Sequence, residues 1–289
     1  MPKRHLLITG VNGFIGSYLA GYFLKNGYRV TGISRTRPEN PGFSWIQADL
    51  SGPFSIPEAD VVVHAAAETR QTEDENACWR NNVQASQNLI NRVLEKKIKK
   101  FVFLSSVSVY GRIDAGVVDE NTPVQHPGAY GRTKHSVERM LEKCSGDFSS
   151  AALRLPAVVG PGAKNIWLAG MLQNMMENKE VGLFNPESLF NNLVHVLDLA
   201  VFIENLCEKE WTGFENLLLG SAHAIRIREV AALMAGKTGY QGAWSARGGG
   251  KKSFLLSFEK ARKLFGYDPM SVKEAVERFA GENKEKVKA

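Results

Sequence analysis

The chain has 289 residues, of which 44% are hydrophobic and 23% charged, a balance that is ordinary for a globular enzyme with a sizeable core. Its 36 basic and 30 acidic side chains leave a net charge of +6, part of it in a C-terminal tail, without a dense basic stripe or a nucleic-acid-binding motif. We therefore expect no nucleic-acid partner, although a mild positive field suits an anionic small-molecule substrate.

The cysteines and the apolar runs indicate a cellular compartment. Cys78, Cys144 and Cys207 are odd in number and far apart, which argues against a disulfide framework or a zinc site. Glycines interrupt the first apolar segment too early for a signal peptide, and no apolar run reaches the length of a membrane span. These features predict a cytoplasmic protein that has no membrane partner.

Apolar runs alternate with amphipathic stretches through the first half of the chain. In chain order they predict a strand at 5–9, a helix at 14–26, strands at 28–33, 43–47 and 60–64, a helix at 76–96, a strand at 100–105, a helix at 128–144 and a strand at 150–155. Strands that alternate with helices predict an α/β fold, a Rossmann-like doubly wound parallel sheet.

The regular alternation of predicted strands and helices ends after residue 160. The predicted elements there are helices at 167–178, 197–209, 226–237, 257–265 and 272–281, extended segments at 193–196 and 214–219, a loop at 248–250 and a frayed tail at 282–289. We predict a dinucleotide-binding Rossmann domain at 1–160, which also receives part of 190–215. Residues 161–289 are expected to form mostly a smaller C-terminal substrate-binding lobe.

A glycine-rich turn follows the first predicted strand directly. Gly10, Gly13 and Gly16 in TGVNGFIG serve a tight turn, close approach of the backbone to phosphate, and close helix–strand packing. A glycine trio alone is weak, but its place between a strand and a helix predicts a site for a dinucleotide pyrophosphate.

A second signal is AYGRTK at 129–134. Tyr130 and Lys134 are four residues apart and lie on one face of the predicted helix. An ammonium near the phenol favours phenolate, so we expect Lys134 to lower the pKa of Tyr130. The pair predicts hydride-transfer chemistry with Tyr130 as the proton donor or acceptor.

These motifs belong to a longer series. The others are Asp49-Leu50, HAAA at 64–67, NVQASQNLI at 82–90, SSVSVYG at 105–111, LRLPAVVGPG at 153–162, HVLDLA at 195–200 and SFEKARKLFGYDP at 257–269. In order and spacing, the chain resembles the extended short-chain dehydrogenase/reductase superfamily, in its NAD-dependent epimerase/dehydratase branch of nucleotide-sugar epimerases and reductases.

The resemblance implies the catalytic set Ser106, Tyr130 and Lys134. Ser106 stands four residues before Tyr110, where the family places its catalytic serine or threonine, and Ser108 is a second candidate for contact with the substrate. Ser106 would hydrogen-bond the substrate oxygen, Tyr130 would exchange a proton with it, and Lys134 would hold the nicotinamide ribose and favour the phenolate.

The resemblance also implies the cofactor contacts. They are Gly10, Gly13, Phe14, Ile15, Gly16, Ser34, Arg35, Asp49, Leu50, Ala65, Ala66, Ala67, Asn82, Tyr130, Lys134 and Leu155. NAD-preferring relatives end the second strand in an acidic residue, whereas this chain has Ser34 followed by Arg35 and, at 37, a second arginine. A guanidinium suits the extra phosphate of NADP, so NADP is favoured over NAD unless these arginines are only solvated loop charges.

Departures from the family pattern narrow the chemistry. Val107-Ser108 replaces the acidic pair of dehydratases, which argues against dehydration. Ala157 replaces a frequent asparagine, and Asn191-Asn192 stands where many relatives carry a diphosphate-binding arginine. We expect Asn191 or Asn192 to hydrogen-bond the substrate, with Lys164 or Arg226 as the source of positive charge, or else these residues merely line a loop.

The histidines give no metal site, because His64, His135 and His195 have no partner at metal-ligand spacing. We expect His64 to be structural and no metal to be bound.

The sequence therefore predicts an NAD(P)-dependent enzyme acting on a nucleotide-activated sugar, by 4-epimerisation or by keto-sugar reduction. The alternatives are a reductase of another small carbonyl compound and a catalytically silent dinucleotide sensor, against which the intact Ser106, Tyr130 and Lys134 argue. The resemblance further implies a homodimer that pairs helices 76–96 and 128–144. The apolar side chains that could serve this pairing are Leu89, Val93, Val137 and Leu141, although some of them must face the chain's own sheet.

Overall fold

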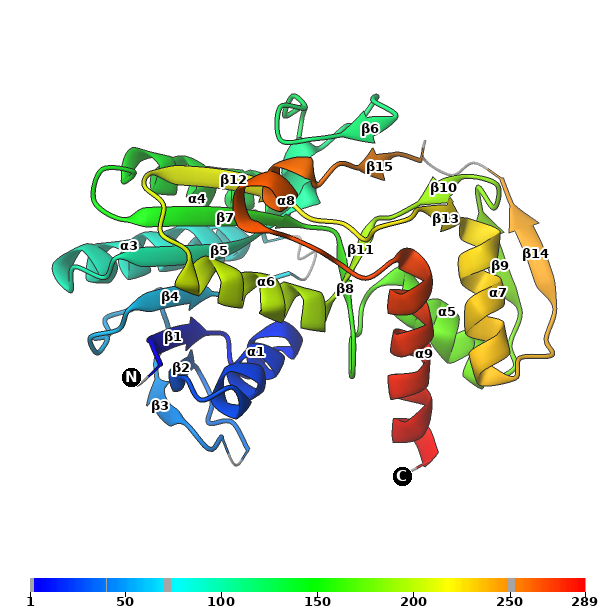
Figure 1. Cartoon of the computed structure of the whole chain (residues 1–289), viewed down its shortest axis with the longest axis horizontal. Helices are drawn as coiled ribbons and strands as arrows, with labels where there is room; N and C mark the ends of the chain where they lie inside the picture. Colours follow the sequence, from blue (N-terminus) through cyan, green and yellow to red (C-terminus); the bar gives the residue numbers. More distant parts are fainter. Residues whose placement is uncertain (1–2, 40, 70–73, 249–252, 289) are drawn as a thin grey trace. The chain divides into compact units, whose positions relative to one another are not determined.

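The computed structural model describes residues 3–39, 41–69, 74–248 and 253–288, and only the backbone of 285–288. The chain forms two compact units (Figure 1). The first unit contains residues 1–112, 123–154 and 203–217, and the second contains 113–122, 155–202 and 218–289. The chain thus leaves the first unit after Arg154 and returns to it for 203–217, while the segment 113–122, which the sequence did not single out, joins the second unit.

The first unit is built on a seven-stranded parallel sheet in the order β12-β7-β5-β4-β1-β2-β3. Its strands are β1 (His5–Thr9), β2 (Arg29–Ser34), β3 (Ser44–Gln47), β4 (Val61–His64), β5 (Lys100–Ser106), β7 (Ser149–Leu155) and β12 (Phe214–Leu218). Leu6 of β1 pairs with Val30 on one side and Val61 on the other, and all three side chains are buried. This strand order confirms the predicted Rossmann-like sheet.

Two layers of helices cover this sheet. The helices of the first unit are α1 (Phe14–Lys25), α2 (Glu75–Trp79), the π-helical turn η1 (Arg80–Gln84), α3 (Ala85–Glu95), the 3-10 turn η2 (Val107–Tyr110) and α4 (Ala129–Lys143). Helices α3 and α4 lie together on one face, and α1 lies on the other (Figure 1). Tyr22 and Tyr28 hydrogen-bond Glu204 and Glu208 of α6 (Val196–Glu208), so the last turns of that helix lie beside α1.

The face under α3 and α4 holds a large apolar core. Leu89, Val93, Val137 and Leu141 are completely buried in it, packed against strand residues such as Phe101. These four side chains therefore belong to the protein's own core and are not available to pair helices between two subunits, as the sequence analysis had suggested. The homodimer itself stays a prediction.

Short strand pairs, the start of α6 and four further helices make up the described part of the second unit. The pairs are β6 (Val117–Val118) with β15 (Leu255–Leu256), β8 (Ala157–Val159) with β11 (Leu193–His195), β9 (Val181–Phe184) with β14 (Trp244–Arg247), and β10 (Leu189–Phe190) with β13 (Ile225–Arg226). The helices are α5 (Trp167–Met176), α7 (Ile227–Thr238), α8 (Glu259–Phe265) and α9 (Val272–Lys288). The sequence missed most of these strands because two to four residues carry no readable alternation.

The end of the chain differs from the prediction. Helix α9 runs to Lys288, so the backbone of the predicted tail at 282–289 is helical throughout its described part. Glu282 and Asn283 contribute to this, since they hydrogen-bond His195 and the backbone of Gly160 and Gly162. Within the predicted loop at 248–250, residues 249 and 250 lie outside the described part.

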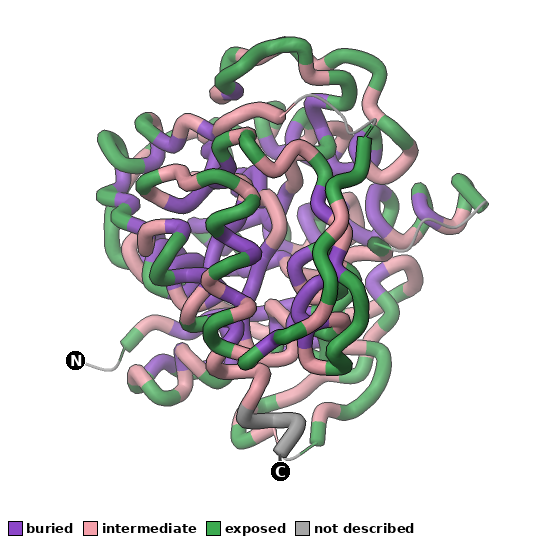
Figure 2. Tube along the Cα trace, turned by 90° about the vertical axis from the view of Figure 1, so that its right-hand side faces the viewer, coloured by how far each residue is buried: buried purple, intermediate pink, exposed green. Residues whose placement is uncertain are grey.

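The inner strands of the sheet are almost entirely buried, and Figure 2 draws buried segments in purple. Among the described residues, no helix is both long enough and apolar enough to cross a membrane.

One carboxyl of the second unit, that of Asp198, is buried and has a raised pKa. Asp198, in the first turn of α6, is 9% exposed and accepts a hydrogen bond from the Met270 amide at 3.1 Å. Burial raises its pKa from 3.8 to about 6, while that amide and Arg278 oppose the change.

We expect Asp198→Asn to stabilise the protein at pH 7.5. The folded pKa lies above the unfolded one, so the folded state binds the extra proton between about pH 4 and 6, and stability falls as pH rises through this range. A displacement of the Asp198 pKa by about two pH units corresponds to a change in the free energy of unfolding of at most roughly 3 kcal/mol at pH 7.5. The asparagine keeps an acceptor for Met270 but has no charge to desolvate.

Urea unfolding at pH 7.5 and pH 4.5 measures this effect, with the exposed Glu259→Gln as control. A gain for Asp198→Asn that is equal at both pH values would show that ionisation of this carboxyl is not the cause.

Candidate active site

The glycine turn brings three backbone segments of the first unit into close contact. Gly10 has a positive φ of 73°, and a Cβ there would lie 2.8 Å from the backbone of Ala66. A Cβ on Gly16 would lie 2.2 Å from the Gly10 carbonyl oxygen. Helix α1 begins after Gly13, which has no side chain to cap it, and its first turn holds no acidic residue. The amide groups of this turn are therefore suited to an anionic group such as a phosphate.

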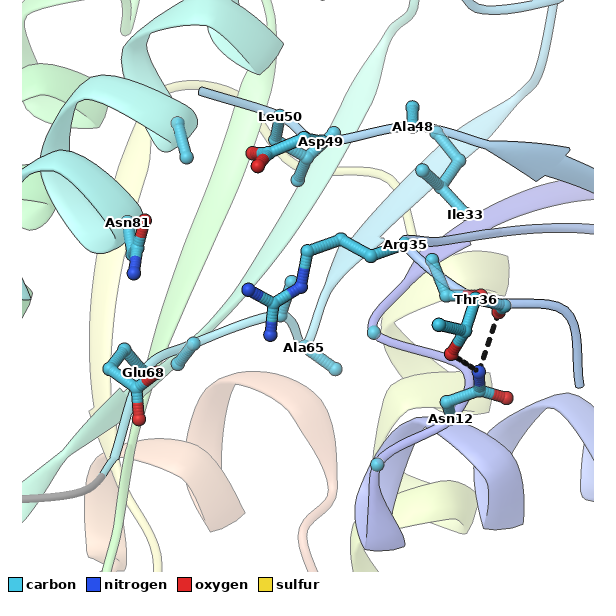
Figure 3. A pocket seen from close by; sticks show the side chains of 16 residues that line it. Asn12, Ile33, Arg35, Thr36, Ala48, Asp49, Leu50, Ala65, Glu68 and Asn81 are labelled. Atoms are coloured by element: carbon cyan, nitrogen blue, oxygen red, sulfur yellow. Dashed lines mark hydrogen bonds between the residues drawn. The ribbon is translucent and has the colours of Figure 1, made fainter. Parts of the chain in front are cut away.

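A cavity of about 480 Å³ lies at this end of the sheet (Figure 3). The predicted cofactor residues that line it are Gly10, Gly13, Ser34, Arg35, Asp49, Leu50, Ala65, Ala66 and Ala67. The lining residues that the sequence analysis did not name are Asn12, Ile33, Thr36, Ala48, Glu68, Asn81 and Ala85. Phe14, Ile15, Gly16, Asn82, Tyr130, Lys134 and Leu155 are not among its lining residues, and Leu155 begins the second unit.

The end of β2 forms one wall of this cavity. The Ser34 hydroxyl donates to the Thr36 carbonyl at 2.7 Å and accepts from the Trp45 indole at 2.8 Å, and Asn12 donates to Thr36 at 2.6 Å. Arg35, in contrast, extends across the cavity (Figure 3). Ser34 therefore shapes the turn, and Arg35 is the cation that this wall presents.

Asp49, which follows the neighbouring strand β3, is one of two carboxylates that line the cavity, the other being Glu68. Hydrogen bonds from the hydroxyl and amide of Ser51 lower the pKa of the Asp49 carboxyl, and the positive charges of Arg35 and Arg80 add to the effect. The Asp49 carboxylate is therefore ionised near neutral pH and can accept hydrogen bonds from a ligand.

The π-helical turn η1 separates the roles of two adjacent asparagines. Asn81 lines the cavity, with its amide in view in Figure 3. Asn82 is 4% exposed; it accepts from the Glu68 amide at 2.7 Å and donates to the Glu68 carbonyl at 3.0 Å and to Thr133 at 3.2 Å. The predicted cofactor contact at Asn82 is therefore a structural brace between the Glu68 segment and α4, and its neighbour Asn81 faces the cavity instead. A π turn adds one residue per turn, which sequence periodicity does not reveal.

Tyr130 and Lys134 come together on α4, as predicted from their spacing. The Lys134 ammonium donates to the Leu104 carbonyl at 2.7 Å, and its nitrogen lies 4.6 Å from the centre of the Phe103 ring and 5.6 Å from that of Tyr130. Lys134 is 3% exposed. Its position is therefore set by the carboxyl end of β5.

The predicted serines lie against the same helix. Ser106 caps η2 by accepting from the Ser108 amide at 3.1 Å, and its hydroxyl lies 3.1 Å from the Ser108 hydroxyl. A Cβ on Gly131 would lie 2.1 Å from the Ser108 carbonyl oxygen, so η2 and the first turn of α4 are in backbone contact. The structure thus brings Ser106 and Ser108 next to the turn that carries Tyr130.

Burial shifts the pKa values of both Tyr130 and Lys134. It raises the pKa of Tyr130, with a smaller contribution from Cys78. It lowers the pKa of Lys134 to about 7, against the opposing charge of Glu138 and a smaller contribution from Cys78. The expectation that Lys134 lowers the Tyr130 pKa is therefore wrong, because desolvation of the buried phenol dominates and raises this pKa.

His64 has a structural environment. Its ring nitrogens lie 2.7 Å from the Thr9 hydroxyl and 2.8 Å from the Ser86 hydroxyl, and burial lowers its pKa to about 3. The ring therefore joins β1, β4 and α3 as a neutral group. Within the described part of the chain, no three His, Cys, Asp or Glu side chains form a group that could hold a metal ion.

The predicted substrate residues of the second unit behave differently from expectation. The Asn191 amide donates to the Leu256 carbonyl at 2.9 Å and accepts from the Leu256 amide at 2.8 Å, and the residue is 6% exposed. Its side chain is therefore occupied in holding β15, which corrects the predicted substrate role of Asn191. The Asn192 Oδ1 atom is buried without a hydrogen-bond partner among the described residues. Arg226 forms an ion pair with Glu187 at 3.5 Å.

The second unit contains a cavity of its own, of about 560 Å³. It is lined by Trp167, Gly170, Met171, Asn174, Val181, Gly182, Leu183, Phe184, Asn185, Ile227 and Arg247. Trp167 and Phe184 are 43% and 48% exposed, and the Arg247 guanidinium lies 6.0 Å from the centre of the Phe184 ring. Aromatic surfaces beside one guanidinium suit a ligand that combines a flat ring with a phosphate. The sequence pattern indicated Lys164 and Arg226 as candidate charges but not Arg247, which only the pairing of β9 with β14 brings into this cavity.

The guanidinium of Arg247 depends on a glycine. A Cβ on Gly182 would lie 2.1 Å from the Arg247 Nε atom. Gly182 therefore provides the space that the arginine side chain occupies.

Comparisons with known proteins agree with this architecture. The sequence description of the NAD dependent epimerase/dehydratase family matches residues 6–216. The UDP-glucose 4-epimerase of Halalkalibacterium halodurans is 25% identical, over 91% of this chain and 90% of that protein. The structure of MoeE5 in complex with UDP-glucose and NAD is 25% identical and superposes with a TM-score of 0.84, over 98% of this chain and 99% of that one.

A shorter match is to a protein that is named for another reaction. The 2-alkyl-3-oxoalkanoate reductase of Shewanella oneidensis is 28% identical, over 56% of this chain and 45% of that protein. The family description, in contrast, extends through all seven strands of the sheet, from β1 into β12. The chain therefore belongs to the NAD dependent epimerase/dehydratase family.

Proposed function

We propose that the protein is an NAD(P)-dependent enzyme that acts on a nucleotide-activated sugar, by 4-epimerisation or by reduction of a keto-sugar. The observation that carries the proposal is the meeting of Tyr130, Lys134, Ser106 and Ser108 at the end of β5, in the same unit as the cavity at the glycine turn. That cavity fits a dinucleotide, because it combines an uncapped helix N-terminus, close backbone packing and an ionised Asp49.

The residues of the chain then have distinct tasks. A bound dinucleotide would supply or accept the hydride at its nicotinamide. Tyr130 exchanges a proton with the substrate oxygen, and the Ser106 and Ser108 hydroxyls hydrogen-bond that oxygen. Lys134, with a pKa of about 7, gains or loses its charge near neutral pH and so biases the proton on Tyr130.

The second cavity supports a nucleotide sugar as the substrate. Trp167 and Phe184 offer surfaces for a base, and Arg247 offers a guanidinium for a phosphate. The relative from Halalkalibacterium halodurans, named as a UDP-glucose 4-epimerase, favours the same substrate class. A reductase of another small carbonyl compound is the second candidate, supported by the match to the Shewanella oneidensis enzyme.

The choice between epimerisation and reduction depends on cofactor exchange. An epimerase returns its hydride to the same substrate, whereas a net reductase must exchange its dinucleotide. Arg35 in the cavity supports binding of NADP, and NADPH is the usual donor for a reduction. The family name and MoeE5, a structure in complex with NAD, support the other choice.

We predict that Tyr130→Phe lowers kcat by about 10²–10⁴-fold, because it removes a positioned acid–base group. Dinucleotide affinity should change little. Turnover on a panel of nucleotide sugars and small carbonyl compounds, together with fluorescence titration of NAD(H) and NADP(H), measures both. Tyr22→Phe, which removes a hydroxyl on α1, is the control. A Tyr130→Phe enzyme that keeps the wild-type rate would exclude Tyr130 as the acid–base group.

We also predict tighter binding of NADP(H) than of NAD(H), and loss of this preference in Arg35→Ala. Removing a charge-assisted contact to the extra phosphate should weaken NADP(H) binding by about 10–100-fold, corresponding to roughly 1.5–3 kcal/mol. Arg37→Ala is the matched control, because Arg37 does not line the cavity. Tighter binding of NAD(H), unchanged by Arg35→Ala, would identify Arg35 as a surface charge only.

A third prediction concerns the cavity of the second unit. Arg247→Ala should weaken nucleotide-sugar binding by about 10–100-fold through loss of a charged hydrogen bond. Gly182→Ala should weaken it as well, because the new methyl group displaces the Arg247 side chain while leaving the backbone in place.

Isothermal titration with nucleotide sugars tests this prediction, and Arg228→Ala, which removes an exposed arginine outside the cavity, is the control. Wild-type affinity in both Arg247→Ala and Gly182→Ala would show that this cavity does not hold the nucleotide.

A further inference from the structure

A buried ion pair includes Glu138, which follows Lys134 of the proposed reaction centre by one turn of α4. Arg154, at the end of β7, donates from Nη2 to the Glu138 carboxylate at 2.7 Å and from Nε at 3.1 Å. The two side chains are only 5% and 3% exposed. A bidentate contact of this kind fixes the orientation of the guanidinium relative to the carboxylate.

The same pair binds two further elements. The Ser105 hydroxyl donates to Glu138 at 2.6 Å, and Arg154 Nη1 donates to the Tyr110 hydroxyl at 3.0 Å. Ser105 belongs to β5 and Tyr110 to η2, so the pair connects α4 and β7 to the segment that carries Ser106 and Ser108.

The spacing along α4 relates this pair to the reaction centre. Tyr130, Lys134 and Glu138 follow one another at intervals of four residues and lie on one face of the helix. On β5, Leu104 accepts from Lys134, and the next residue, Ser105, donates to Glu138. Two consecutive residues of β5 thus set the position of two consecutive turns of α4.

We propose that Glu138 is a positioning residue for the reaction: held by Arg154 and Ser105, its carboxylate maintains the charge of Lys134 and the register of α4 against the Ser106 segment. This inference rests on the proposed role of Tyr130 and Lys134 in hydride-transfer chemistry. An apolar residue at this buried position would pack with a lower desolvation cost. The hydrogen bonds of Glu138 to Arg154 and Ser105 offset the cost of burying its carboxylate.

The groups around Lys134 define what its charge depends on. Tyr130 and Glu138 face it from its own helix, the Leu104 carbonyl and the Phe103 ring from β5, and the His64 ring and the Cys78 sulfur contribute from β4 and α2. His64 is neutral because its pKa is about 3. Glu138 is the larger of the two influences that favour the charged form of Lys134, and Arg154 is the cation that it balances.

The test measures the proton of Lys134 directly. Protein with 13C-labelled lysine is titrated by NMR, and the Lys134 signal is assigned by its loss in Lys134→Met. In Glu138→Gln, Lys134 should release its proton at a pH at least one unit lower than in the wild type, which corresponds to a tenfold lower proton affinity. The reason is that no carboxylate then opposes the positive charge of the buried Arg154. In Arg154→Met, Lys134 should release its proton at a higher pH than in the wild type, because the Glu138 carboxylate then has only the charge of Lys134 to balance.

The double variant Glu138→Gln with Arg154→Met removes both charges and should return the titration toward the wild-type value. It also provides a form without an isolated buried charge, should either single variant fail to fold. Glu142→Gln, one turn further along α4 and exposed, is the matched control and should leave the titration unchanged.

Two results would overturn the proposal. One is a Lys134 titration that is the same in Glu138→Gln as in the wild type. The other is an equal displacement in the same direction in Glu138→Gln and in Arg154→Met, which would assign the effect to altered packing, because opposite charges must displace the titration in opposite directions. Neither result depends on a substrate, so failure here is distinct from failure of Tyr130→Phe to lower turnover.

Discussion

The first unit depends on one steric constraint, which is that β1, the start of α1 and the end of β4 meet without side chains between them. A Cβ at Gly16 would lie 2.2 Å from the Gly10 carbonyl, and one at Gly10 would lie 2.8 Å from Ala66. Neither distance is compatible with a folded backbone of this shape. Because these segments are so close, the uncapped amides of α1 face the same space as Asp49 and Arg35, and a cavity with both charges results. The shape of this cavity thus follows from the absence of a methyl-sized group at Gly10 and at Gly16.

Burial is the second constraint, and it determines the chemistry. Lys134 lies deep enough for desolvation to bring its pKa to about 7, and the same desolvation keeps the proton on Tyr130. A surface lysine would be permanently charged and could not respond to small changes around it. The structure holds this sensitive group between the Leu104 carbonyl and the Glu138 carboxylate, each fixed by β5. The proposed reaction centre is therefore a part of the core that contains ionisable groups, in which Arg154 balances the charge of Glu138.

The second unit is held together by side chains that complete the hydrogen bonding of short strands. Asn191 pairs with both backbone groups of Leu256, and Asn283 bonds the Gly160 carbonyl and the Gly162 amide. A polar side chain in such a position replaces a neighbouring strand and leaves nothing for a ligand. The role of cation in this unit's cavity accordingly falls to Arg247, whose guanidinium occupies the space next to Gly182. An arginine in place of Asn191 could not satisfy Leu256 in this way, because it has no acceptor.

The sequence by itself determined the parallel sheet of the first unit, because each of its inner strands is a buried apolar run and each glycine of the turn has a local steric reason. It also determined that Tyr130 and Lys134 share a face, since helical spacing is a local property. Tertiary structure decided whether Asn81 or Asn82 faces the cavity, because both lie within a π turn, which changes the helical phase. It decided the fate of Asn191, whose partner Leu256 is 65 residues away, and the ionisation of Lys134, which depends on desolvation. Local patterns determine elements and faces, whereas hydrogen-bond partners and burial come from segments that are distant in the chain and meet only in the folded protein.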